Sequence, residues 1–161
     1  MEQENIENQA MKFAMKLLGV RRRSVFEIRK RLEEKGCVEN IIDKTIKELF
    51  EYKYLNDEEF AEAYINDKIN FNPRGSFLIK KELREKGIAE NIIDEKIKEL
   101  LSEEKEIKLA EKAARKKLEF LNKDLEKNKI YQKVGSHLQT KGYSSYIIRE
   151  VLENVLSAND L

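Results

Sequence analysis

The sequence is poor in residues that interrupt helices and in residues that cross-link a fold. Its 161 residues include six glycines, one proline, one cysteine, one histidine and no tryptophan. The lone Cys37 excludes an internal disulfide, and one cysteine with one histidine cannot provide the ligand spacing of a structural zinc site. Because helix breakers are scarce while Lys, Glu and Leu are abundant, the composition predicts an all-α fold.

Long hydrophobic runs and catalytic motifs are also missing. No apolar run approaches the roughly 20 residues that a membrane-spanning helix requires, and the N-terminus lacks the basic and apolar regions of a secretory signal. No glycine-rich phosphate loop occurs, and the carboxylates are dispersed. We therefore expect a cytoplasmic protein without membrane contact, catalytic residues, cofactor or metal.

Three segments of the chain repeat one pattern. They align without a gap on a Lys-Gly pair and cover residues 28–50, 79–101 and 134–156. Apolar residues stand 8 and 4 positions before each glycine and 6, 10 and 13 positions after it, so each side of the turn has the apolar face of a helix. A glycine between two helices supplies the left-handed conformation that ends the first one. We therefore predict positive φ angles at Gly36 and Gly87.

A further helix is expected before each of these pairs, at residues 6–20, 57–71 and 103–121. Ser24-x-x-Glu27 and Asn56-x-x-Glu59 fit the capping-box pattern of helix starts, and the polar residues 122–129 are the expected linker. The sequence thus predicts nine helices in three tandem three-helix repeats, at residues 1–55, 56–102 and 103–161. Because such repeats contact mainly their neighbours, we expect a curved, elongated array.

The second repeat contains the most specific family signature. Residues 54–64, YLNDEEFAEAY, resemble the Tyr-Leu-Asp-Asp segment of the RecX family, which is followed by Phe-Ala and a tyrosine. Residues 75–88 and 17–36 look like the signatures of that family's second and first repeats. Asn56 stands where aspartate is commoner, and Lys53 where glycine or an aromatic residue often precedes the Tyr-Leu pair. The resemblance extends from about Ala14 to Leu156.

This resemblance implies a function that periodicity alone does not indicate. RecX-like proteins are non-enzymatic regulators that lie in the groove of the RecA filament on single-stranded DNA. They mainly inhibit its ATPase, strand-exchange and co-protease activities, and thereby act in DNA repair, recombination and the SOS response. We expect this chain to do the same as a monomer, with weak direct DNA contact as a further possibility.

Charge is segregated along the repeats although the net charge is only +1. Residues 21–36, 73–87 and 129–142 carry net charges of +4, +3 and +3, while residues 37–51, 88–104 and 143–161 carry −2, −4 and −2. One interpretation is that these are solvated faces joined by salt bridges within each repeat. The other is a periodic basic stripe that meets an acidic or phosphate-bearing groove.

The second interpretation identifies a partner-binding set on the basic helices. Lys30 and Lys81 lie opposite the apolar faces of their helices and are expected to point outward. The full set is Arg21, Arg22, Arg23, Arg29, Lys30, Arg74, Lys80, Lys81 and Arg84. An alternative function is direct DNA binding, since tandem helix-turn-helix units also read DNA. The nearly neutral net charge argues against it as the main activity.

The elongated array is testable by small-angle X-ray scattering. A compact domain of this length has a radius of gyration of about 15 Å. We expect a clearly larger value, because each repeat is predicted to bury its own apolar set. A scattering profile that fits a compact sphere would contradict the repeat arrangement.

Overall fold

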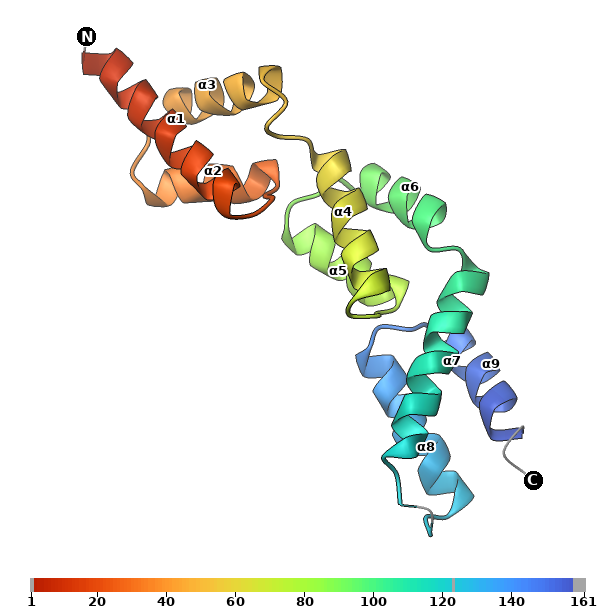
Figure 1. The fold of residues 1–161 in the computed structure, drawn as a ribbon. Helices are drawn as coiled ribbons and strands as arrows, with labels where there is room; N and C mark the ends of the chain where they lie inside the picture. Colours follow the sequence, from red (N-terminus) through yellow and green to blue (C-terminus); the bar gives the residue numbers. More distant parts are fainter. Residues whose placement is uncertain (1, 123, 158–161) are drawn as a thin grey trace. The chain divides into compact units, whose positions relative to one another are not determined.

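The computed structural model describes residues 2–122 and 124–157, and over these residues the chain forms nine α-helices and no strand (Figure 1). Their bounds are α1 Glu2–Val20, α2 Val25–Glu34, α3 Glu39–Glu51, α4 Asp57–Asn70, α5 Ser76–Glu85, α6 Glu90–Leu100, α7 Glu103–Glu119, α8 Lys127–Thr140 and α9 Ser145–Ser157. The predicted all-α fold of three tandem three-helix repeats is confirmed.

The start of α8 differs from the expectation. Residues 122–129 were expected to form a linker, but the helix begins at Lys127. Glu126 has the extended conformation of an N-cap, and its carbonyl accepts hydrogen bonds from the N–H groups of Lys129 and Ile130. Polar composition marked this stretch as a loop, whereas its last residues are compatible with the first helical turn.

The first repeat has its own apolar core. Helix α1 packs against α2 and α3, which also pack against each other. The buried residues are Ala10, Ala14, Ile28, Leu32, Ile41, Ile42, Ile46, Leu49 and Leu55. Cys37 is partly buried and packs against this core.

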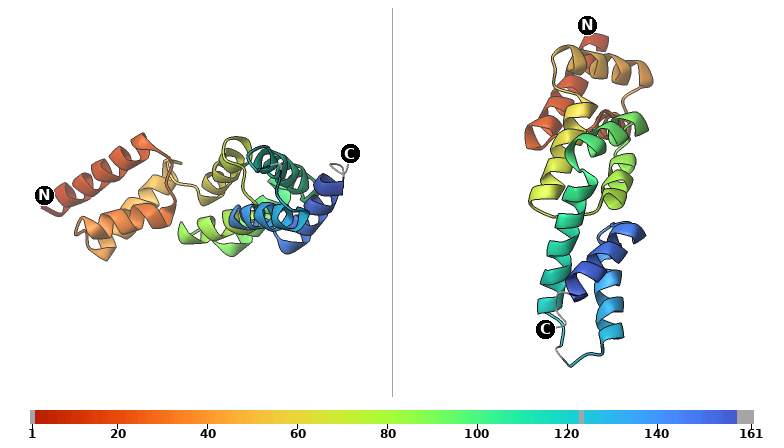
Figure 2. Two further views of the ribbon diagram at one scale, coloured as in Figure 1. Left: turned by 90° about the horizontal axis from the view of Figure 1, so that it is seen from below. Right: turned by 90° about the vertical axis from the view of Figure 1, so that its right-hand side faces the viewer.

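The third repeat is built in the same way. Helix α7 packs along both α8 and α9, which also contact each other (Figure 2). The buried residues are Ala110, Ala114, Val134, Leu138, Tyr143, Ile147, Val151, Leu152 and Val155. The alanines of α7 allow the other two helices to approach closely, so the repeat buries a small core without large aromatic residues apart from Tyr143.

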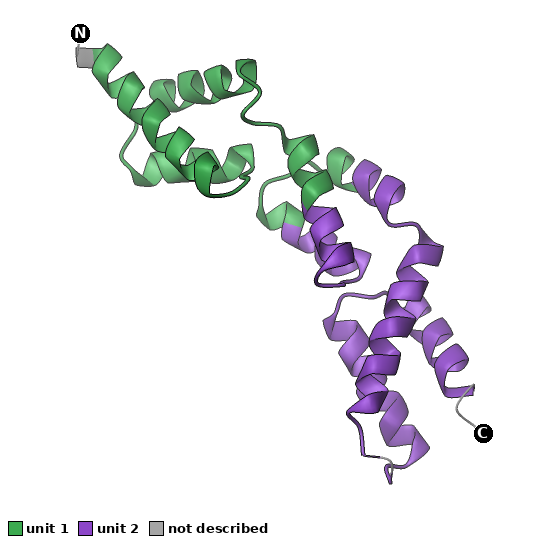
Figure 3. Cartoon of the chain, in the orientation of Figure 1, with its two compact units in different colours: residues 1–63, 83–93 green, residues 64–82, 94–161 purple. Residues whose placement is uncertain are grey.

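Two compact units divide the chain differently from the sequence repeats (Figure 3). Unit 1 comprises residues 1–63 and 83–93, and unit 2 comprises residues 64–82 and 94–161. The division passes through all three helices of the second repeat, which therefore contributes residues to both units. The repeat boundaries at residues 55 and 102 stay a prediction.

The turns of the three repeats have the predicted backbone conformation. The φ angles of Gly36, Gly87 and Gly142 are 87°, 74° and 86°, so positive φ is confirmed at the first two and also occurs at the third. Lys53 has a φ of 59° in the turn before α4. This left-handed conformation explains why glycine suits the position before the Tyr-Leu pair, because a side chain there costs roughly 1–2 kcal/mol.

Gly36 and Gly87 differ in what surrounds them. A Cβ atom on Gly36 would meet no heavy atom within 4 Å, whereas a Cβ atom on Gly87 would lie 2.3 Å from the Cβ of Phe26. Phe26 belongs to α2 of the first repeat. Gly87 therefore serves both as a left-handed residue and as the place where the second repeat's turn lies against the first repeat within unit 1.

This difference predicts unequal effects of one substitution. Gly36→Ala should lower the free energy of unfolding by roughly 1–2 kcal/mol through the left-handed conformation alone. Gly87→Ala should lower it by about 1–3 kcal/mol more, because Phe26 and its helix must shift. Urea unfolding followed by circular dichroism measures both values. Equal losses would show that the contact with Phe26 does not constrain Gly87.

Candidate partner-binding surface

The N-terminus of the basic helix α2 is held by the repeat that follows it. Ser24, its N-cap, forms the predicted capping box with Glu27, and its hydroxyl donates a 2.6 Å hydrogen bond to the carbonyl of Lys86. The N–H of Val25 donates to the Asp57 carboxylate at 2.9 Å. The Asp57 carboxylate and the Ser24 hydroxyl thus accept from the N–H groups of Val25 and Glu27, which a helix start leaves without partners. All of these residues belong to unit 1.

Within unit 2 the basic helix α5 has an equivalent arrangement. The N–H of Gly75 donates to the carbonyl of Lys141 at 2.8 Å, and the N–H of Ser76 donates to the Glu106 carboxylate at 2.7 Å. Counted from the repeat glycines, Gly75 and Ser76 correspond to Ser24 and Val25. Both helices that carry the predicted basic set are therefore positioned by a turn carbonyl and a carboxylate of the next repeat.

Burial changes the acidity of the groups at these two contacts. It raises the pKa of Asp57 and of Glu106, and the hydrogen bonds from Val25 and Ser76 only partly oppose it. Burial, together with the nearby Glu106 carboxylate, also raises the pKa of Tyr143 to about 12. The Tyr143 hydroxyl is buried without a hydrogen-bond partner among the described residues. The contact in unit 2 thus brings a charged carboxylate into an environment that favours the neutral form.

Most of the predicted basic residues form ion pairs within the chain. Each of them contacts a carboxylate of its own or an adjacent element. The pairs are Arg21 with Glu27, Arg29 with Glu39 and Asp43, Arg74 with Glu82, Lys80 with Asp94, and Arg84 with Glu90. Arg23 instead donates from Nε to the carbonyl of Leu17 at 3.3 Å. Salt bridges within repeats, the first of the two interpretations, therefore account for much of this charge.

Three residues of the set differ from the others. Arg22, Lys30 and Lys81 are exposed and have no ion pair within residues 2–122 and 124–157. Lys30 and Lys81 occupy equivalent positions in α2 and α5, and their predicted outward orientation is confirmed by their exposure. Positive charge that is available to a partner thus recurs once on each of the first two basic helices.

The paired residues can also exchange partners at small cost. The side chains of the Arg84–Glu90 pair are 48% and 52% exposed. Exposed ion pairs of this kind contribute about 0–1 kcal/mol, so an external carboxylate or phosphate can replace the internal partner. Arg74 and Glu82 are less exposed, at 24% and 17%. Arg74 is therefore the paired residue least suited to bind another molecule.

A small hollow in unit 1 brings Arg22 and Arg23 together with the family-like segment. It measures about 220 Å³, and its lining includes Lys53, Tyr54 and Asn56. Sequence reasoning did not select Lys53, although its place directly before Tyr54 in the signature is a signal that could have identified it. Three cations, Arg22, Arg23 and Lys53, and one carboxylate, Glu59, therefore border this hollow.

Other features of the described residues bear on function. No group of three or more His, Cys, Asp or Glu side chains in this part of the chain could hold a metal ion. No described helix is long and apolar enough to cross a membrane. His137 is half-buried beside α7, and burial lowers its pKa.

Three similar helical modules in tandem, with exposed lysines at equivalent positions of the first two, define a helical-repeat protein. Family models described as the first, second and third three-helix domains of RecX match residues 10–49, 56–97 and 103–152. The chain belongs to the RecX family.

Curated relatives support this assignment. The chain is 39% identical over 136 residues to the regulatory protein RecX of Clostridium acetobutylicum, covering 83% of this chain and 63% of the relative. It is 32% identical over 148 residues to the regulatory protein RecX of Prosthecochloris aestuarii, covering 92% of this chain and 94% of the relative. The chain therefore spans less than two thirds of the first relative and nearly all of the second.

Solved structures have the same fold. The crystal structure of RecX from Lactobacillus salivarius superposes with a TM-score of 0.86 at 23% identity, covering 96% of this chain and 99% of that one. A second crystal structure, of a regulatory protein RecX, gives a TM-score of 0.84 at 27% identity and covers 93% of this chain and 74% of the other.

Burial of Glu106 predicts that the difference in stability between Glu106→Gln and the unmodified protein depends on pH. Glu106→Gln keeps an oxygen that accepts the Ser76 N–H, whereas Glu106→Ala leaves that N–H without a partner and should cost about 1–3 kcal/mol. Because the folded-state pKa of Glu106 is raised, its favourable protonated form is lost as the pH rises. The stability of Glu106→Gln relative to the unmodified protein should therefore increase between about pH 4 and about pH 7.

Urea unfolding of both proteins at the two pH values measures this difference. The stability of Glu106→Gln relative to the unmodified protein could instead be the same at both pH values, or could fall as the pH rises. Either result would show that burial does not govern the ionisation of Glu106.

Proposed function

We propose that this protein binds the RecA filament on single-stranded DNA and restrains its ATP hydrolysis, strand exchange and co-protease activity, without catalysing a reaction. The observation that carries this proposal is the tandem match to all three RecX domains, together with relatives named regulatory proteins. We further propose that it acts in the cytoplasm as a monomer, in DNA repair, recombination and the SOS response.

The proposed contact uses the basic helices. A helical filament presents the same surface at regular intervals, and a tandem repeat can present the same side chains at each of them. Lys30 and Lys81 fit this requirement because they are equivalent, exposed and without ion pairs in the described chain. Arg22 adds a third available cation. The paired residues Arg21, Arg29, Lys80 and Arg84 would contribute by exchanging their internal carboxylates for acidic groups of the filament.

The experiment measures inhibition of DNA-dependent ATP hydrolysis by RecA. The unmodified protein should slow hydrolysis, and a variant with Arg22→Glu, Lys30→Glu and Lys81→Glu should inhibit at least about tenfold less well. Each exposed contact contributes up to about 1 kcal/mol, so Lys30→Glu alone should have only a small effect. These three positions are chosen because reversing them breaks no ion pair that the structure shows.

A matched control reverses three exposed lysines outside the predicted set. The variant with Lys16→Glu, Lys47→Glu and Lys98→Glu has the same net charge as the test variant. It should inhibit like the unmodified protein. If both variants lose inhibition equally, net charge and not the basic helices governs binding. If the unmodified protein neither binds the filament nor slows hydrolysis, the proposed function is wrong.

A further inference from the structure

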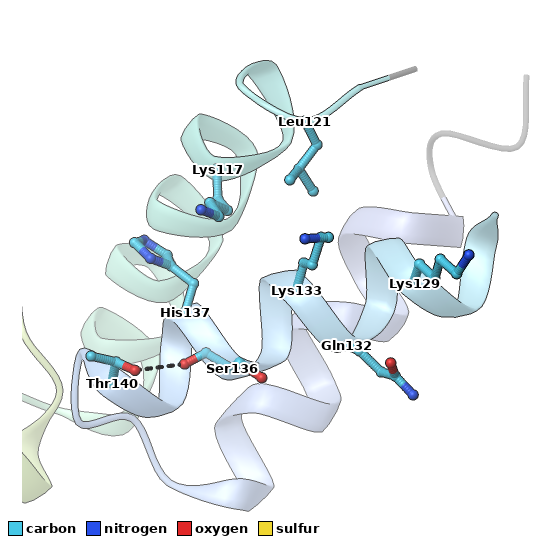
Figure 4. Close-up of a pocket in the computed structure, with 8 residues that line it drawn as sticks. All are labelled: Lys117, Leu121, Lys129, Gln132, Lys133, Ser136, His137 and Thr140. Carbon is cyan, nitrogen blue, oxygen red and sulfur yellow. Dashed lines mark hydrogen bonds between the residues drawn. The ribbon is translucent and has the colours of Figure 1, made fainter. Parts of the chain in front are cut away.

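The third repeat contains a hollow, and none of its residues belongs to the predicted partner-binding set. It measures about 520 Å³ and lies between α7 and α8. Lys117 and Leu121 border it from α7 and the turn that follows, and Lys133 and His137 face them from α8 (Figure 4). The complete lining, here called the α7–α8 hollow, is Lys117, Leu121, Lys129, Gln132, Lys133, Ser136, His137 and Thr140.

The charge of the α7–α8 hollow has one sign. Its lining includes three lysines and no carboxylate. Lys117, Lys129 and Lys133 form no ion pair with any residue that the structure describes. Burial lowers the pKa of His137, and the charges of Lys117 and Lys141 lower it by smaller amounts. The side chains that line the α7–α8 hollow therefore carry positive charge and no negative charge.

The repeat alignment explains why this charge is unbalanced. In the first repeat, Glu39 and Asp43 neutralise the basic helix from positions 3 and 7 residues after the glycine. The second repeat also has carboxylates at both positions. The equivalent residues of the third repeat are Ser145 and Arg149. The third repeat thus keeps a basic second helix but lacks the acidic residues that balance it elsewhere.

We propose that the α7–α8 hollow binds the phosphate backbone of single-stranded nucleic acid. Lysines, hydroxyl groups and amide groups are the side chains that contact phosphate and sugar without reading sequence. On α8 the lining residues from Lys129 to Thr140 recur every three or four positions and so share one face of the helix. That face is roughly 16 Å long, from Lys129 to Thr140, and can therefore follow more than one phosphate of a bound strand.

The lining also distinguishes among anionic partners. Protein interfaces depend on buried apolar or aromatic anchors, but Leu121 is the only large apolar residue in this lining. Phe120, directly before it, is 77% exposed. An exposed ring one residue from the lining of the α7–α8 hollow is suited to stack on an unpaired base, which favours a single strand over a duplex. This site needs no recombinase and does not depend on the proposed filament contact.

The test is fluorescence anisotropy with a labelled oligothymidine and no RecA, over a series of salt concentrations. The unmodified protein should bind more weakly as salt rises. The variant with Lys117→Gln and Lys133→Gln should bind at least about tenfold more weakly. The slope of log affinity against log salt should fall in magnitude by about 1.4, or 0.7 for each phosphate that a lysine no longer neutralises. Circular dichroism checks that the variant keeps its helical content.

The matched control neutralises two exposed lysines of the first repeat, Lys16→Gln and Lys47→Gln, and should bind like the unmodified protein. The proposal is overturned if the unmodified protein does not bind the oligonucleotide, or if the test variant keeps its affinity and salt slope. It is also overturned if the control loses as much affinity as the test variant. Equal or tighter binding to a duplex, or preferential binding to polyglutamate, would assign the hollow to a different partner. Inhibition of RecA in the ATPase assay is a separate readout, so either proposal can fail without the other.

Discussion

Two backbone carbonyls, those of Lys86 and Lys141, hold the basic helices of this protein in position. Each precedes a repeat glycine with positive φ, and each accepts a hydrogen bond at the N-terminus of the second helix of the preceding repeat. Lys86 accepts from the hydroxyl of Ser24, and Lys141 accepts from the N–H of Gly75. A buried O–H or N–H group left without an acceptor costs about 1–3 kcal/mol. The turn that ends one helix therefore also positions another, and the exposed lysines of α2 and α5 depend on that contact.

The charges of the three repeats are organised in two ways. In the first two repeats, carboxylates of the third helix balance the second helix and leave Lys30 and Lys81 without a partner in the described chain. In the third repeat these carboxylates are absent, and several lysines border one hollow. The two surfaces suit different partners, because isolated cations at repeated positions fit a periodic protein surface and a continuous basic face fits a phosphate chain.

The sequence alone predicted the features that depend on local periodicity. The glycine turns, the capping box at Ser24 and the apolar faces are confirmed, since each follows from residues within about one helix of one another. The carboxylates that contact the preceding repeat were not predicted, because Asp57 and Glu106 lie about 30 residues from the N–H groups that donate to them. The ion pairs of Arg29 could have been predicted from the repeat register. The α7–α8 hollow could not, because Lys117 and Lys133 lie outside the aligned segments of the repeat pattern.

The most direct test of the central claim is co-sedimentation of this protein with RecA filaments assembled on single-stranded DNA with ATP. To separate filament binding from direct DNA binding, the protein carries Lys117→Gln and Lys133→Gln, and bare DNA and free RecA are sedimented in parallel. We expect this protein to sediment with filaments and not with bare DNA. Its absence from the filament pellet would show that it does not bind the filament.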